Sequence, residues 1–123
     1  MDKAQAIHNF WSGFGWDAYD ENSVPDDAEY PRITYEVQTD SLDNILLLSA
    51  SLWDRSTSWE RVSKKAEQIA QEIVHIYPAA IRIAGGGLYI SKGTPFASRM
   101  SEPNNDTIKR IYLNINAEFL TAD

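Results

Sequence analysis

The chain contains no cysteine and only two histidines, so several kinds of chemistry are excluded or nearly so. Without cysteine there is no disulfide, no thiol nucleophile and no thiolate metal site. His8 and His75 have no motif partner in the sequence, which leaves few candidates for metal binding or acid–base catalysis. A Ser/His/Asp set can be assembled from any chain rich in serine and aspartate, so that possibility alone indicates nothing.

Basic residues are also scarce. Eleven Lys and Arg stand against 18 Asp and Glu, which gives a formal net charge of −7. Nucleic-acid binding by charge needs clustered Lys and Arg that displace counterions from the phosphates. The balance therefore argues against a nucleic-acid partner, and it favours solubility and a basic or polar protein partner.

Long apolar runs are missing as well. The longest, "ILLLSASLW", is interrupted by two serines and falls short of the roughly 20 residues that span a bilayer. The first residues, "MDKAQAIHNFW", lack the cationic and apolar regions of a secretory signal. We therefore expect an intracellular product without a membrane association. At 123 residues and 43% apolar content, we expect one domain covering residues 1–123.

A first amphipathic helix is expected near the N-terminus. Asp2 and Gln5 are spaced as a capping box, and Gly13 and Gly15 provide a stop signal. The apolar stripe, at helical spacing, consists of Ala4, Ile7, Trp11 and Phe14.

A second helix has the clearest pattern in the chain. Thr57 and Glu60, in "TSWE", form a capping box at its start, and Pro78 ends it. Glu60 and Lys64 are placed for an i,i+4 ion pair. One face is apolar and carries Val62, Ala66, Ile69, Ala70, Ile73 and Tyr77.

Strands follow from alternation with a period of two. Residues 32–38 and 45–55 alternate on either side of the polar turn "TDSLDN" and predict a hairpin. "AIRIAGGGLYISKG" predicts a strand, a glycine-broken turn and a strand. "TIKRIYLNINAEFL" predicts a long central strand. Two helices on one face of a mostly antiparallel sheet, in the order α-β-β-α-β-β-β, define an α+β fold.

The acidic stretch "GWDAYDENSVPDDAEYPRITY" holds six carboxylates within residues 17–29. A calcium loop of the EF-hand type needs a central glycine and fixed ligand spacing, whereas here Pro25 interrupts the spacing. A solvated loop held by Trp16, Tyr19 and Tyr30 fits better. The "GGG" at residues 85–87 precedes a strand pattern, not the helix that a phosphate loop requires. We expect no catalytic residue, no cofactor and no metal.

Two further features indicate protein contacts. Trp53 and Trp59 flank the turn "DRSTS", and they either clamp the hairpin to the second helix or anchor a subunit interface. Residues 92–106 have no periodicity and predict a long loop, either passive or ordered against a neighbouring subunit. The candidate interface residues are Trp53, Arg55, Trp59, Phe96, Arg99 and Met100.

Several segments together resemble a known family. They are "VP" at Val24–Pro25, "YPRITY" at residues 30–35, "LWDRSTSW" at residues 52–59, and the amphipathic helix behind them. The likeness covers most of residues 5–120. It is to small proteins encoded in the tail-morphogenesis region of Firmicutes phages and prophages, and these look like the tail-terminator, or tail-completion, family of long-tailed phages.

The resemblance implies a structural virion protein without catalysis or cofactor. Such proteins are made in the bacterial cytoplasm and form a homo-hexameric ring at the head–tail junction. The ring ends polymerisation of the tail tube protein and meets a head-completion or connector protein. DNA passes through the ring, and an acidic wall would repel its phosphates. The alternatives are a connector protein of the same neck region, a cytoplasmic adaptor that binds one basic partner, and a small enzyme built on the acidic stretch or the histidines.

Overall fold

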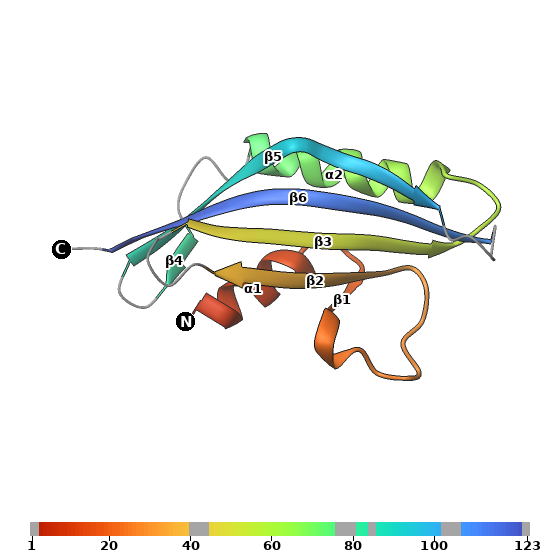
Figure 1. Cartoon of the computed structure of the whole chain (residues 1–123), viewed down its shortest axis with the longest axis horizontal. Coiled ribbons are helices and arrows are strands. Elements are labelled where there is room, and N and C mark those ends of the chain that lie inside the picture. The colour runs from red at the N-terminus through yellow and green to blue at the C-terminus, as the bar shows by residue number, and fades with distance from the viewer. Residues whose placement is uncertain (1–2, 40–44, 76–80, 84–85, 102–106, 122–123) are drawn as a thin grey trace.

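The computed structural model describes residues 3–39, 45–75, 81–83, 86–101 and 107–121. Two α-helices, one 3-10 turn and six strands follow each other along the chain (Figure 1). They are α1 (Lys3–Ser12), β1 (Asp17–Asp20), η1 (Glu21–Ser23), β2 (Arg32–Thr39), β3 (Ile45–Arg55), α2 (Glu60–His75), β4 (Ile81–Ile83), β5 (Gly86–Ser101) and β6 (Ile108–Thr121). Neither described α-helix is long and apolar enough to cross a membrane.

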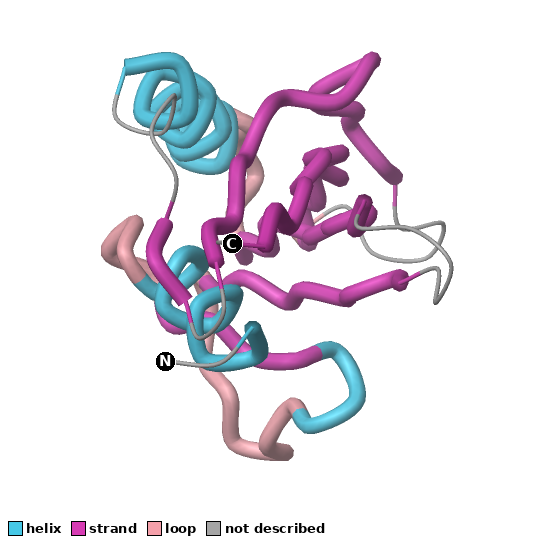
Figure 2. The backbone as a smooth tube through the Cα atoms, turned by 90° about the vertical axis from the view of Figure 1, so that its left-hand side faces the viewer, coloured by secondary structure: helices cyan, strands magenta, loops and turns pink. Residues whose placement is uncertain are grey.

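All six strands form one sheet with the order β1-β2-β3-β6-β5-β4. Neighbouring strands are antiparallel except for β1 and β2, which run parallel. Both α-helices lie on the same side of the curved sheet, and the other side carries no α-helix among the described residues (Figure 2). The α+β class, with two helices on one face of a mostly antiparallel sheet, is confirmed.

The core fills the space between the helices and the sheet. Its largest fully buried side chains are Phe10, Trp11, Ile33, Leu48, Leu52, Val62, Ile69, Leu88, Leu113 and Ile115. The apolar stripe expected for the first helix is confirmed at Ile7, Trp11 and Phe14, all of which are buried. The side chain of Ala4 and the expected cap at Asp2 lie outside the residues that the structure describes.

The hairpin of β2 and β3 and the long strand β6 follow the alternation in the sequence. Ile33 pairs with Leu52, and Tyr35 with Ala50, so that these side chains face the helices. β6 lies between β3 and β5, which confirms its central place. The turn between β2 and β3 falls on residues 40–44, outside the described part of the chain.

The second helix begins where expected, but a different hydroxyl caps it. The Glu60 N–H donates to Ser58 Oγ at 3.1 Å, and the Ser58 N–H donates to Ser56 Oγ at 3.0 Å. Ser58 therefore replaces the expected Thr57 as the capping residue, because its hydroxyl reaches a free N–H of the first turn. The Glu60–Lys64 pair is confirmed at 2.8 Å. Tyr77 and Pro78 lie outside the described residues.

The prediction of a loop at residues 92–106 is wrong for residues 92–101, which belong to β5. β5 continues to Ser101 and pairs with β6 along almost its whole length. The register shifts between Lys92 and Ala97, and Pro95 lies inside this irregular stretch, where a residue without an N–H breaks no ladder bond. The register shift interrupts the alternation of inward and outward side chains, so local periodicity does not reveal the strand. Residues 102–106 lie outside the described residues.

The acidic stretch also contains more structure than a solvated loop. Its first residues form β1, which pairs with Arg32–Tyr35 of β2 in parallel. The 3-10 turn η1 follows, and the Ala28 N–H donates to the Pro25 carbonyl at 3.1 Å to close a turn. The observed order, α-β-β-β-α-β-β-β, thus has one strand more before α2 than predicted.

Candidate subunit interface

Five of the six candidate interface residues meet at one end of the sheet. There β3 ends at Arg55, which pairs with Ile108 at the start of β6, and β5 ends beside Lys109 of β6. The same register places Trp53 and Met100 on either side of Arg110. Phe96 lies further along β5 and packs partly buried against the core. The fold thus brings Trp53, Arg55 and Trp59 to the same end of the sheet as Arg99 and Met100, although the two groups are at least 40 positions apart in the sequence.

On the helix side of the sheet, two cations lie against Trp59. The guanidinium carbon of Arg99 is 4.9 Å from the ring centroid, and Lys109 Nζ is 5.5 Å from it. Trp59 is partly buried and packs against the core, whereas Arg99 is exposed. A cation over an indole face is attracted by the negative ring surface. Trp59 thus fixes the position of a positive charge at the surface.

Trp53 lies on the opposite side of the sheet, so it does not clamp the hairpin to α2. Its Nε1 donates to Thr34 Oγ1 at 2.9 Å, and the Arg110 guanidinium carbon lies 4.7 Å from its ring. Arg110 Nε also donates to Ser51 Oγ at 2.9 Å. Successive side chains of a strand point to opposite faces of the sheet. Leu52 is buried on the helix side, so the next residue, Trp53, points to the other side. Met100 beside this group is 39% exposed.

Arg55 belongs to a third group at the same end. Its guanidinium carbon lies 4.8 Å from the Tyr30 ring, and that of Arg32 lies 4.2 Å from the same ring. Arg32 Nη1 donates to the Ala28 carbonyl at 3.1 Å, which holds the end of the acidic stretch against the sheet. A cavity of about 450 Å³ adjoins this group, and it is lined by Ala28, Glu29, Tyr30, Arg55 and Arg61.

A buried ion pair that sequence reasoning missed fastens this corner. Asp54 is fully buried, and Arg61 Nε donates to both carboxylate oxygens at 3.1 and 3.0 Å, with a further bond from Nη2. The Asp54 carboxylate raises the pKa of Arg61 through this hydrogen bond. The sequence contains a pattern that could have predicted this pair. Asp54 continues the inward-facing series of Leu48, Ala50 and Leu52, so its carboxylate faces the core and needs a cation as partner.

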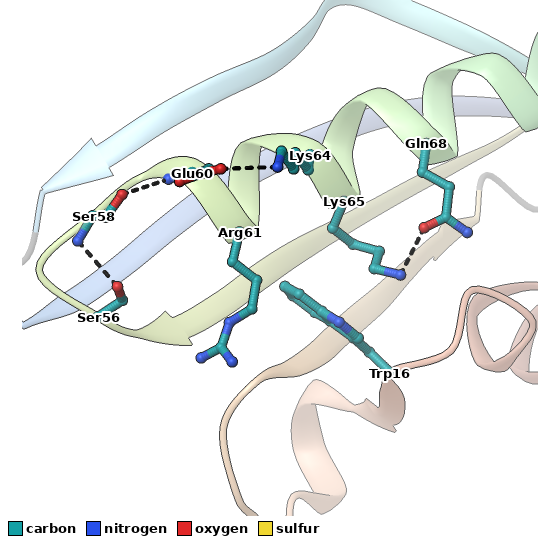
Figure 3. A pocket seen from close by; sticks show the side chains of 8 residues that line it. All are labelled: Trp16, Ser56, Ser58, Glu60, Arg61, Lys64, Lys65 and Gln68. Atoms are coloured by element: carbon teal, nitrogen blue, oxygen red, sulfur yellow. Dashed lines mark hydrogen bonds and ion pairs between the residues drawn. The ribbon is translucent and has the colours of Figure 1, made fainter.

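The largest cavity among those described, about 500 Å³, lies next to this pair (Figure 3). Arg61 and Lys65 point from α2 toward Trp16 in Figure 3. Each cation around it already has a protein partner: Arg61 binds Asp54, Lys64 binds Glu60, and Lys65 Nζ donates to the Phe14 carbonyl at 2.6 Å. Burial lowers the pKa of Lys65. This arrangement braces α2 against the segment after α1.

The remaining candidates for chemistry are the carboxylates and the histidines. No three His, Asp or Glu side chains there are grouped as metal ligands. His8 Nδ1 lies 3.0 Å from the Tyr35 hydroxyl and its Nε2 lies 3.3 Å from Ser12 Oγ. Burial, followed by the charge of Asp20, raises the pKa of Tyr35, so its hydroxyl is not activated as a base. The side chain of His75 is outside the described set.

Comparison with known proteins supports the fold. No family model matches the chain, and no curated protein matches it. Among solved structures, the chain is similar to a chain described as "Virion of native gene transfer agent (GTA) particle". The TM-score is 0.56 at 14% identity, and the match covers 89% of this chain and 83% of the other. At this identity the likeness establishes a shared fold.

Proposed function

We propose that this protein is a structural subunit of a phage-like virion, and that its copies form a hexameric ring that terminates the tail tube and joins it to the head. The observation that carries the proposal is the fold match, because it extends over nearly all of both chains and the matched chain belongs to a virion particle. The sequence resemblance to tail terminators, made from different features, points the same way.

The shape of the sheet suits assembly into a ring. β4 pairs only with residues 86–88, so residues 89–101 of β5 have β6 on one side and no strand on the other among the described residues. β1 forms the opposite edge of the sheet. A ring needs two different patches on each subunit, one for each neighbour, and two unlike edges provide them. The proposed partners are further copies of the chain, the tail tube protein and a head-completion or connector protein.

The proposed contact region at one of these edges comprises Trp59 and Arg99 on the helix side of the sheet and Met100 on its other side. Tryptophan and arginine are enriched among residues that dominate binding energy, and Arg99 and Met100 are both exposed on β5. The proposed role involves no reaction and no cofactor, and the protein acts through its surfaces alone.

The test is capping of tail tubes. Purified protein is mixed with tail tubes, and negative-stain electron microscopy is used to look for rings at one tube end and for arrested elongation. An Arg99→Ala/Met100→Ser variant should lose at least tenfold in binding, as expected when central interface residues are truncated. Val74→Ser, which removes an exposed apolar residue from α2, is the control.

Two results would contradict the proposal in different ways. Wild-type protein that neither binds tubes nor stops their growth would remove the terminator role. Binding to the portal end of capsids in place of tubes would instead favour the connector protein of the same neck region. A variant that caps tubes as well as wild type would show that the contact lies elsewhere.

A further inference from the structure

The two edges of the sheet carry opposite charge. Six carboxylates lie on β1, η1 and the segment that follows, and all six are exposed; this acidic edge comprises Asp17, Asp20, Glu21, Asp26, Asp27 and Glu29. Residues 13–31 contain no Lys or Arg. β5, along the other margin, contains Lys92 and Arg99 and no carboxylate (Figure 1). We call Lys92 and Arg99 the basic edge.

The fold separates these edges by almost the full width of the sheet. The strand order places β2, β3 and β6 between β1 and β5. Lys92 and Arg99 are therefore separated from the acidic edge by three strands. The two ion pairs described above, Arg61–Asp54 and Lys64–Glu60, involve no member of either edge.

We propose that the acidic edge of one copy docks on the basic edge of the next copy. This proposal rests on the proposed function, since it names the contact by which copies of the chain assemble. The two edges of a copy differ, so the contact is head-to-tail and leaves a free edge at each end until the chain of copies closes. Pairing of two β5 edges would place Lys92 and Arg99 against their own counterparts, and like charges in an interface oppose that arrangement.

Local structure holds both edges in place for such a contact. Lys92 Nζ lies 6.0 Å from the Phe96 ring and Arg99 lies over Trp59, so the side chains of the basic edge are oriented by aromatic rings. Asp26 and Asp27 occupy the centre of the turn closed between Pro25 and Ala28. The charges of Asp26 and Asp27 thus lie on a hydrogen-bonded turn at the margin of the sheet.

Charge reversal tests the contact. The acidic edge is reversed by Asp26→Lys/Asp27→Lys and the basic edge by Lys92→Glu/Arg99→Glu. All four side chains are exposed, so both variants should fold, which circular dichroism checks. Sedimentation velocity at low salt should show that each variant alone associates at least tenfold more weakly than wild type. An equimolar mixture should regain association, because each variant then meets an edge of opposite charge.

The control changes the same charge elsewhere. Glu67→Lys/Glu118→Lys alters two exposed carboxylates on α2 and β6 and should associate like wild type. Added salt should weaken association of wild type and of the mixture alike.

Three outcomes would overturn the contact. They are single variants that assemble like wild type, a mixture that stays as weak as its components, and wild-type protein that remains monomeric at low salt and at the highest soluble concentration. None of them decides the tail-tube role, which depends on capping. Wild-type rings on tubes together with unaffected variants would retain the ring and reject this contact.

Discussion

Asp54 lies fully buried beneath the first turn of α2, where the Arg61 guanidinium binds both of its carboxylate oxygens. The pair joins the end of β3 to the start of α2, and it therefore fixes the angle at which the helix crosses the sheet. Arg61 keeps 55% of its side chain exposed, so only the carboxylate is fully removed from water. Loss of the ion pair is therefore more unfavourable for Asp54 than for Arg61, because Arg61 can still be hydrated.

Removal of the arginine should cost more than removal of a surface partner. Arg61→Ala leaves a buried carboxylate without its cation and should lower the free energy of unfolding by about 3 kcal/mol. Lys64→Ala, one turn along the same helix face, breaks only the exposed pair with Glu60 and should change the free energy of unfolding only slightly. Urea titration of both variants compares the two. Equal losses would show that Asp54 is satisfied without Arg61.

The pH dependence of stability should carry a contribution from Glu21. Burial, then a hydrogen bond and the negative charge of Glu36, raise the pKa of Glu21 above its ordinary value of 4.5. An acidic group whose pKa is higher in the folded state than in the unfolded state stabilises the fold at pH values below its unfolded pKa. This contribution is lost as the pH rises through the folded pKa. Ionised Glu21 is therefore unfavourable at neutral pH.

Glu21→Gln should accordingly stabilise the fold at pH 7 by a few tenths of a kcal/mol, the scale of surface substitutions. The gain should disappear below pH 4.5, where the native side chain is also protonated. Thermal unfolding across pH 4 to 8 measures this, with Glu67→Gln on α2 as the control. A gain that is independent of pH would contradict the assignment.

The Trp53–Thr34 bond predicts a pair of compensating substitutions. Trp53→Phe removes the donor to Thr34 Oγ1, whose residue is only 8% exposed, and should cost about 1 kcal/mol for the hydrogen bond. Adding Thr34→Val replaces the stranded hydroxyl with a methyl group of similar shape and should recover part of the loss. If the second substitution lowers the unfolding free energy further, the bond is not the main contribution of Trp53.

Gly93 should not tolerate a side chain. A Cβ at this position would lie 2.9 Å from both the Cβ and the carbonyl oxygen of Asn114 on β6. Asn114 Nδ2 also donates to the Pro95 carbonyl at 3.0 Å, so it has little freedom to move away. Gly93→Ala should cost about 1 to 3 kcal/mol as overpacking.

Gly13→Ala is the control for that substitution, because the nearest atoms lie 3.4 Å from its added Cβ. It should leave the unfolding midpoint close to that of wild type. Similar midpoints for the two variants would mean that β5 shifts away from β6 without a loss of packing.

The parts of the fold with regular alternation were predictable from the sequence, because their side chains report burial directly. β2, β3, β6 and α2 all appear in the sequence as periods of two or 3.6 residues. The second half of β5 did not, because the register shift breaks the alternation. β1 is only four residues long, and its outer positions are acidic.

The candidate interface was predictable only in part. Tryptophan beside the hairpin indicated a candidate region, but sequence alone could not place Arg99 over Trp59, because that contact depends on how β5 pairs with β6. The separation of charge onto two edges required the strand order, which no linear pattern contains.

The irregular stretch around Pro95 has a consequence for the solubility of the free subunit. A long strand with exposed N–H and C=O groups is a template onto which other chains add without limit, and proteins block such growth with proline, bulges and lysine at the margin. β5 has all three, with Lys92 directly before the shifted register and Pro95 inside it. These features oppose the stacking of copies of the chain into fibrils through that strand.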